Sequence, residues 1–162
     1  MNDIEPVIAK ATTPEEQSDG IVVSFAAEWH QPLLGKKFTA VIRKRVPKTV
    51  KSRWLYFHIN APVCAICGRA EICSIDDIDL KEAQLLSKEL ALQPAEITAY
   101  FGGDKTVGCY RLGHIALTNN ELSKQTLSSR LTYHPPQSFF ILSHAAKKII
   151  DSLAGFHGRT KE

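Results

Sequence analysis

The sequence lacks the features that identify membrane and secreted proteins. Its longest apolar runs, such as residues 21–25 and 62–67, fall well short of the roughly 20 residues that a membrane-spanning helix needs. The acidic first residues, 1–6, are not followed by an apolar stretch or a small-residue cleavage site, so no secretory signal is expected. We therefore expect a soluble, cytoplasmic protein that does not contact a membrane.

Cysteine is scarce, and its four residues form no recognisable metal or redox motif. Cys64 and Cys67 are spaced like a metal or redox pair, but residues 63–75 have the character of a strand, in which side chains three apart point to opposite faces. No second close Cys/His pair follows, and no helix begins at this pair, as a redox motif requires. We expect reduced, buried cysteines and neither a metal nor a cofactor. The cysteines are Cys64, Cys67, Cys73 and Cys109.

The composition is that of a single globular domain. The chain has 162 residues, of which 44% are apolar and 23% charged, and this length and mixture are typical of one folded unit. Residues 1–19 are polar with little periodicity, which predicts a mobile N-terminal arm. We expect the domain itself to span residues 20–155 and to be followed by a short tail, residues 156–162.

Acidic residues are absent from one long basic stretch. The net charge of +3 is small, but no Asp or Glu occurs between Lys36 and Arg53, whereas residues 71–89 are mostly acidic. Such a stretch is either a solvated edge kept soluble by its charge or a surface that binds phosphate. The basic residues are Lys36, Lys37, Arg43, Lys44, Arg45, Lys48, Lys51 and Arg53.

Hydrophobic periodicity predicts alternating strands and short helices. Apolar residues alternate from Phe38 to Ile42, as in a half-buried strand, and this period places Arg43 and Arg45 on one face and Lys44 on the other. Asp79 is the expected N-cap of an amphipathic helix. The predicted strands are 21–25, 38–43, 54–59, 63–75 and 107–117, and the predicted helices are 26–34, 79–92, 94–100 and 143–153.

Six short motifs, in order along the chain, together resemble the ASCH domain family. They are Ser24 with Trp29, residues 43–48, residues 61–63 leading to 68–72, residues 99–103, residues 108–112, and residues 135–139. The resemblance covers residues 21 to about 142. It implies an α+β fold, a small PUA-like β-barrel of about five to six mixed strands with flanking helices, and a role in recognising RNA or nucleotides. It also implies a structural role for residues 135–139.

The sequence departs from the family's signature of Gly, Lys, Glu and Arg. With the arginine placed on Arg43, the other three positions hold Lys36, Phe38 and Val41. Some family members are amidohydrolases that act on acylated nucleosides, and only fragments of their catalytic set, such as Thr39 and Glu71, remain here. The missing acid at Val41 leaves Arg43 without a same-face carboxylate, and an unpaired arginine is well suited to a bidentate contact with phosphate.

We therefore predict a non-catalytic, regulatory domain that binds nucleic acid, RNA rather than DNA. One alternative is a small amidohydrolase acting on acylated nucleosides, or a ribonuclease, that uses Lys36 or Lys37 with Thr39 and Glu71. Another is a protein-interaction domain that docks an acidic partner. The sequence does not predict the oligomeric state. The expected binding residues are Trp29, Lys36, Lys37, Thr39, Arg43, Lys44, Arg45, Lys48, Lys51, Arg53 and Tyr110.

Overall fold

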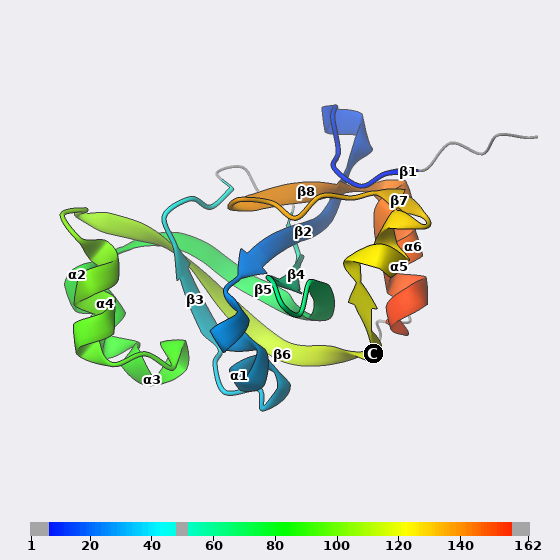
Figure 1. Ribbon diagram of the computed structural model, residues 1–162. Helices are drawn as coiled ribbons and strands as arrows, with labels where there is room; N and C mark the ends of the chain where they lie inside the picture. Colours follow the sequence, from blue (N-terminus) through cyan, green and yellow to red (C-terminus); the bar gives the residue numbers. More distant parts are fainter. Residues whose placement is uncertain (1–6, 48–51, 157–162) are drawn as a thin grey trace, which may run out of the picture.

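The computed structural model describes residues 7–47 and 52–156, which form an α+β fold built on a six-stranded mixed sheet (Figure 1). The strand order is β3-β6-β5-β4-β2-β8, and a separate two-stranded sheet pairs β1 with β7. The strands are β1 (Val7–Ile8), β2 (Gln17–Phe25), β3 (Ala40–Arg43), β4 (Trp54–Ile59), β5 (Ala65–Asp79), β6 (Thr106–Ser123), β7 (Leu131–Thr132) and β8 (Phe139–Ser143).

Short helices flank the sheet at both ends. In Figure 1, α2 to α4 lie beside β3 at one end of the molecule, and α5 and α6 lie at the other. The helices are the 3-10 turns η1 (Pro14–Glu16) and η2 (Ala27–Trp29), and α1 (His30–Leu34), α2 (Leu80–Leu85), α3 (Ser87–Leu90), α4 (Pro94–Phe101), α5 (Lys124–Ser128) and α6 (His144–Ala154). In the described part of the chain, no helix is both long enough and apolar enough to cross a membrane.

The pairing of β2 gives the sheet its mixed character. β2 runs parallel to β4 and antiparallel to β8, while β4, β5, β6 and β3 pair antiparallel in turn. β3 and β8 lie at the two ends of this order, and no pairing between described residues joins them. The closed barrel that the family resemblance implies therefore stays a prediction, whereas the mixed sheet with flanking helices is confirmed.

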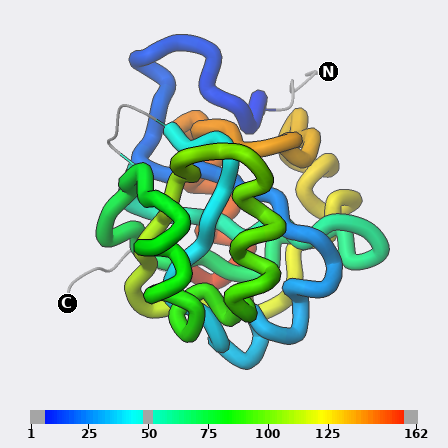
Figure 2. Tube along the Cα trace, turned by 90° about the vertical axis from the view of Figure 1, so that its left-hand side faces the viewer, coloured from blue at the N-terminus to red at the C-terminus, as the bar shows by residue number. Residues whose placement is uncertain are grey.

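Strand β3 is buried on both faces, not on one as its alternating pattern predicted. Val41 belongs to the central apolar core, and Ala40 and Ile42 belong to a second cluster with Ile97 and Phe101 of α4. Figure 2 shows α2 to α4 in front of this part of the sheet. These helices come from a segment 40 to 60 residues further along the chain, so the local pattern of β3 did not reveal them.

A local capping signal located the start of α2 correctly. Asp79 caps α2: its side chain accepts a hydrogen bond from the backbone N–H of Glu82, whose side chain accepts one from the N–H of Asp79. The helix expected over residues 79–92 is instead divided into α2 and α3 at Leu86. The last helix was also predicted, and Ser143 caps it by accepting a hydrogen bond from the N–H of Ala146.

Residues 7–19, expected to be a mobile arm, pack against the domain. Val7 and Ile8 pair with β7, Ala9 is buried, and the Ser143 hydroxyl donates a hydrogen bond to the carbonyl oxygen of Ile8. Val7 and Ala9 belong to the apolar cluster around Leu142 of β8 and Ile150 of α6. Sequence periodicity alone does not reveal a contact between the two ends of a chain.

The cysteines are reduced, but they are not all buried. Cys67 and Cys109 lie in the core, where burial raises their pKa to about 12 and about 11. Cys73 is exposed on β5, so the expectation of burial is wrong for this residue. Cys64 is half-buried just before β5 begins.

Candidate nucleic-acid interface

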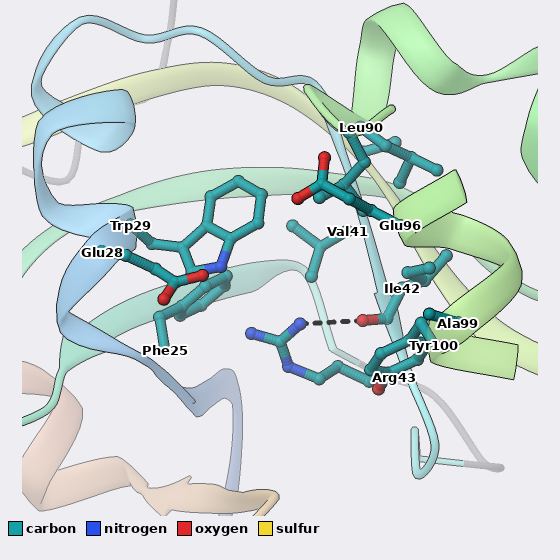
Figure 3. Close-up of a pocket in the computed structure, with 12 residues that line it drawn as sticks. Phe25, Glu28, Trp29, Val41, Ile42, Arg43, Leu90, Glu96, Ala99 and Tyr100 are labelled. Carbon is teal, nitrogen blue, oxygen red and sulfur yellow. Dashed lines mark hydrogen bonds between the residues drawn. The ribbon is translucent and has the colours of Figure 1, made fainter. Parts of the chain in front are cut away.

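A cavity of about 430 Å³ lies between η2 and α4, with β3 as its floor. Figure 3 shows that Trp29 and Phe25 line one side, that Tyr100 and Ile42 line the other, and that the guanidinium of Arg43 lies between them. Below, we call this space the aromatic cavity. Its lining residues are Phe25, Glu28, Trp29, Ala40, Val41, Ile42, Arg43, Leu90, Leu92, Glu96, Ala99 and Tyr100.

Arg43 is held by backbone carbonyls and an aromatic ring rather than by a carboxylate. Its Nη1 donates to the carbonyl oxygen of Ile42 at 2.8 Å, and its Nη2 donates to that of Ser24 at 3.2 Å. Its Cζ lies 4.3 Å from the centroid of the Phe25 ring. Burial lowers the pKa of Arg43, while Tyr100 and Tyr110 act in the opposite direction. In the described residues no ion pair offsets this cation, so its charge is available to a ligand.

Trp29 is fixed at one edge and open on the side of the cavity. The ring packs edge-on against Phe38, with the two centroids 5.4 Å apart and the rings at 88°. Phe38 is itself fully buried against Phe57 and Phe25. Trp29 is only half-buried and lines the cavity (Figure 3), so a planar ligand has a rigid aromatic surface beside it.

Two exposed carboxylates complete the lining of the aromatic cavity. Glu28 comes from η2 and Glu96 from α4, and Glu96 also accepts a hydrogen bond from the backbone N–H of Gln93 at 2.8 Å. Carboxylates accept hydrogen bonds from amino and imino groups and repel phosphate. This cavity therefore suits the donor groups of a base rather than a phosphate.

A second cavity, also of about 430 Å³, is basic and adjoins the first. The two share Arg43 and Tyr100. Below, we call this second space the basic cavity. It is lined by Arg43, Lys44, Arg45, Tyr100, Gln137 and Ser138.

Contacts within the described chain shape the basic cavity. The Lys44 ammonium pairs with Asp104 at 2.6 Å and lies 4.9 Å from the Tyr100 ring centroid. The Ser24 hydroxyl donates to the carbonyl oxygen of Pro136 at 2.7 Å, which holds the segment before β8 close to β2. Arg45 is exposed. The cavity thus combines a partly neutralised lysine with two arginines that no described carboxylate pairs.

Arg43, Lys44 and Arg45 all line the basic cavity, which differs from the predicted separation of Lys44 from the two arginines. The separation assumed that the strand continues through Arg45. Strand β3 ends at Arg43, and beyond that residue the two-residue period no longer determines where side chains point.

The other residues expected at the interface lie elsewhere or are not described. Lys36, Lys37 and Thr39 are exposed around the loop after α1 and line neither cavity. Arg53 pairs with Glu71 at 3.2 Å and lies over the Trp54 ring. Lys48 and Lys51 lie outside the described residues.

Tyr110 is fully buried in the central core, and its ring therefore offers no face to a base. Its hydroxyl has no hydrogen-bond partner among the described residues, and burial raises its pKa. The nearby Arg43 guanidinium acts against this rise. Tyr110 is thus a core residue beneath the interface rather than part of it.

The fragments of a hydrolase site do not form a bonded set. Glu71 is engaged with Arg53, and the backbone carbonyl of Thr39 accepts from the N–H of Leu112 at 2.8 Å. No hydrogen bond between described residues joins Thr39, Lys37 and Glu71.

Several cavity residues were not among the predicted contacts. Phe25 and Glu28 lie within the predicted Ser24–Trp29 segment, and residues 40–42 directly precede Arg43. The others come from segments more than 40 residues from Arg43. A signal did exist, because two of the family-like motifs, residues 99–103 and 135–139, supply part of the lining. The second motif was expected to be structural. The missed residues are Phe25, Glu28, Ala40, Val41, Ile42, Leu90, Leu92, Glu96, Ala99, Tyr100, Gln137 and Ser138.

Comparison with known proteins finds similarity at the level of structure. Neither the known protein-family models nor the curated proteins include a match to this chain. The structure of ASCH from Zymomonas mobilis is 22% identical, with a TM-score of 0.75 over 83% of this chain and 95% of that one. A mutant of the same protein gives 0.76 over 84% and 99%. The N-terminal domain of Staphylothermus marinus McrB is more distant, at 8% identity and a TM-score of 0.51, with 93% and 99% covered.

Proposed function

Because this chain has the fold of an ASCH domain, we propose that it binds single-stranded nucleic acid, RNA rather than DNA, without cleaving it. A base enters the aromatic cavity beside Trp29, and the adjoining phosphate lies in the basic cavity at Arg43, Lys44 and Arg45. The two cavities meet at Arg43, as a base and its phosphate meet through one sugar.

The observation that carries this proposal is that Arg43 has no carboxylate partner among the described residues. A half-buried arginine without a carboxylate is costly unless its charge is used, and guanidinium groups form strong bidentate contacts with phosphate. Here the cation is oriented in advance by Ile42, Ser24 and Phe25 and borders both cavities.

The choice of a single strand follows from the shape of the aromatic cavity. A base reaches a concave aromatic site only when it is unstacked, which is common in single-stranded RNA loops. The resemblance to ASCH domains supports RNA over DNA. The regulatory role and the cytoplasmic location remain part of the same proposal.

The test is a titration of the full chain with a labelled single-stranded RNA of mixed sequence at increasing salt, with DNA of the same sequence as the control. With phosphate contacts from the two unpaired arginines, at about 0.7 per contact, the logarithm of the binding constant should fall with log salt at a slope of roughly −1.4. Failure to bind RNA at low salt contradicts the proposal, and equal affinity for DNA contradicts the preference for RNA. Turnover of an acylated nucleoside or cleavage of the RNA supports the hydrolase alternative instead.

A further inference from the structure

Three side chains of different chemistry meet near the start of α1, away from both cavities. They are His30 of α1, Cys67 of β5 and Glu121 of β6, and their ligand atoms all lie within 4.8 Å of one another. None of the three lines the aromatic or the basic cavity. The group is therefore separate from the proposed nucleic-acid interface.

A bulge in the sheet accounts for the meeting of Cys67 and Glu121. Ile66 is paired with Leu122 and Gly68 with Leu117, so residues 118–121 of β6 lie opposite Cys67 alone. Bulges of this kind redirect side chains and are common beside functional sites.

The third member, His30, reaches the bulge from the turn that follows β2. It is the first residue of α1 and comes directly after Trp29. Its Nε2 lies 2.6 Å from Oε2 of Glu121.

The donor set selects the kind of ion. An imidazole nitrogen, a cysteine sulfur and a carboxylate oxygen are the three ligand types found together in zinc sites, whereas calcium and magnesium require oxygen ligands. We propose that His30, Cys67 and Glu121 bind a Zn²⁺ ion with three protein ligands and a water molecule in the fourth position. On binding, the thiol proton of Cys67 is released to solvent and the sulfur coordinates as a thiolate.

The His30–Glu121 pair needs only a small adjustment to hold the ion. Bond lengths of about 2.1 Å to nitrogen and oxygen place two tetrahedral ligand atoms roughly 3.4 Å apart. The His30 and Glu121 atoms must therefore separate by less than about 1 Å from their present hydrogen-bonding distance. Their side chains are 21% and 40% exposed, whereas Cys67 is buried in the core.

The bound ion would cross-link strands β5 and β6 to the turn that carries Trp29. The ion joins α1 to β5 and β6, three segments that are distant in sequence. Without a metal, the same three groups form only a hydrogen-bonded set in which Glu121 bonds His30.

Cobalt provides a direct test, because a thiolate bound to Co²⁺ gives a charge-transfer band in the near ultraviolet. The full chain, stripped with a chelator, is titrated with Co²⁺ and then with Zn²⁺. We expect the band to appear and Zn²⁺ to displace it. A chain that gives no band, and that binds no Zn²⁺ in competition with a chromophoric chelator, overturns the proposal.

Variants locate the site and guard against misfolding. His30→Gln and Glu121→Gln change partly exposed residues and should weaken Zn²⁺ binding at least about tenfold, since even partners that only support a metal ligand have effects of that size. Cys67→Ala should abolish the cobalt band. His114→Gln and Cys73→Ala, exposed on β6 and β5, are the controls and should leave binding unchanged. Binding that is unaltered in both His30→Gln and Glu121→Gln contradicts the assignment.

Discussion

The Arg43 guanidinium lies over the ring of Phe25, with its Cζ 4.3 Å from the ring centroid. This cation–π contact, together with two backbone carbonyls, holds the cation at the boundary of the two cavities. A cation on an aromatic ring gains about 0.5 to 2 kcal/mol, and the planar guanidinium gains most from lying flat on it. The orientation of Arg43 is therefore built into the fold before any ligand arrives.

Replacement of Arg43 by lysine keeps the charge but removes the planar fork. We expect Arg43→Lys to weaken RNA binding about tenfold and Arg43→Gln to weaken it further, because only the arginine makes a bidentate phosphate contact. Fluorescence anisotropy with labelled RNA measures both effects. Lys81→Gln, an exposed change on α2 that touches neither cavity, is the matched control. If Lys81→Gln weakens RNA binding as much as Arg43→Gln does, the affinity depends on the total charge and not on a contact at Arg43.

The two tryptophans allow base stacking to be detected directly. Trp29 lines the aromatic cavity, whereas Trp54 is covered by Arg69, whose Cζ lies 3.8 Å from its ring centroid. RNA should therefore quench the fluorescence of a Trp54→Phe variant and leave that of a Trp29→Phe variant almost unchanged. Trp29→Ala should lower the affinity by roughly 1 to 3 kcal/mol, the usual contribution of one stacked base. Quenching that depends on Trp54 would contradict the assigned site.

The ion pair with Asp104 reduces the positive charge that Lys44 offers to a phosphate. The Asp104 carboxylate pairs with the Lys44 ammonium at 2.6 Å on the exposed side of the basic cavity. Asp104→Asn frees that cation, so we expect RNA binding to strengthen a few-fold and the salt slope to steepen by about 0.7. Glu15→Gln, which removes an exposed carboxylate of η1 far from Lys44 in sequence, should leave the slope unchanged. A slope that does not respond to Asp104→Asn would exclude Lys44 from phosphate contact.

His58 should make the stability of the fold depend on pH. It is buried, and its Nδ1 is hydrogen-bonded to the Tyr133 hydroxyl at 2.8 Å. Burial, helped by Lys124, lowers its pKa from 6.5 to about 4. Between these values the unfolded chain binds a proton that the folded chain does not, so the free energy of unfolding falls as the pH falls from 6.5 to 4. The total loss is on the order of 3 kcal/mol.

Urea unfolding at pH 7 and pH 4.5 measures this loss. His58→Gln should flatten the dependence, because the titrating group is gone. His134→Gln, at an exposed position, should not. An equally steep dependence in His58→Gln would assign the effect to other groups.

Elements specified by neighbouring residues were predictable from the sequence. The Asp79 cap, the β4 strand and the start of α6 depend on residues within a few positions, and all were placed closely. Strands β1 and β7 were missed, because two residues each are too few for a periodic signal and their pairing joins opposite ends of the chain.

The candidate site was predictable only in part, for the same reason. Trp29 and Arg43 were expected and do line the aromatic cavity. Glu96 and Tyr100 face them from a helix more than 50 residues further on, which no local pattern reveals. Tyr110 was expected to contact the ligand but is buried. The residues next to a tyrosine in a strand do not indicate which elements will pack over it.

The position of β2 also matters while the chain is being made. One of its edges pairs with β4 and the other with β8, which begins only at Phe139. Until β8 has left the ribosome, this second edge of β2, around Val22, has no partner strand, and another extended chain can pair with it. Nascent chains that stop before β8 should therefore aggregate or recruit chaperones. Pairing of β8 with β2 closes this edge and removes the site for aggregation.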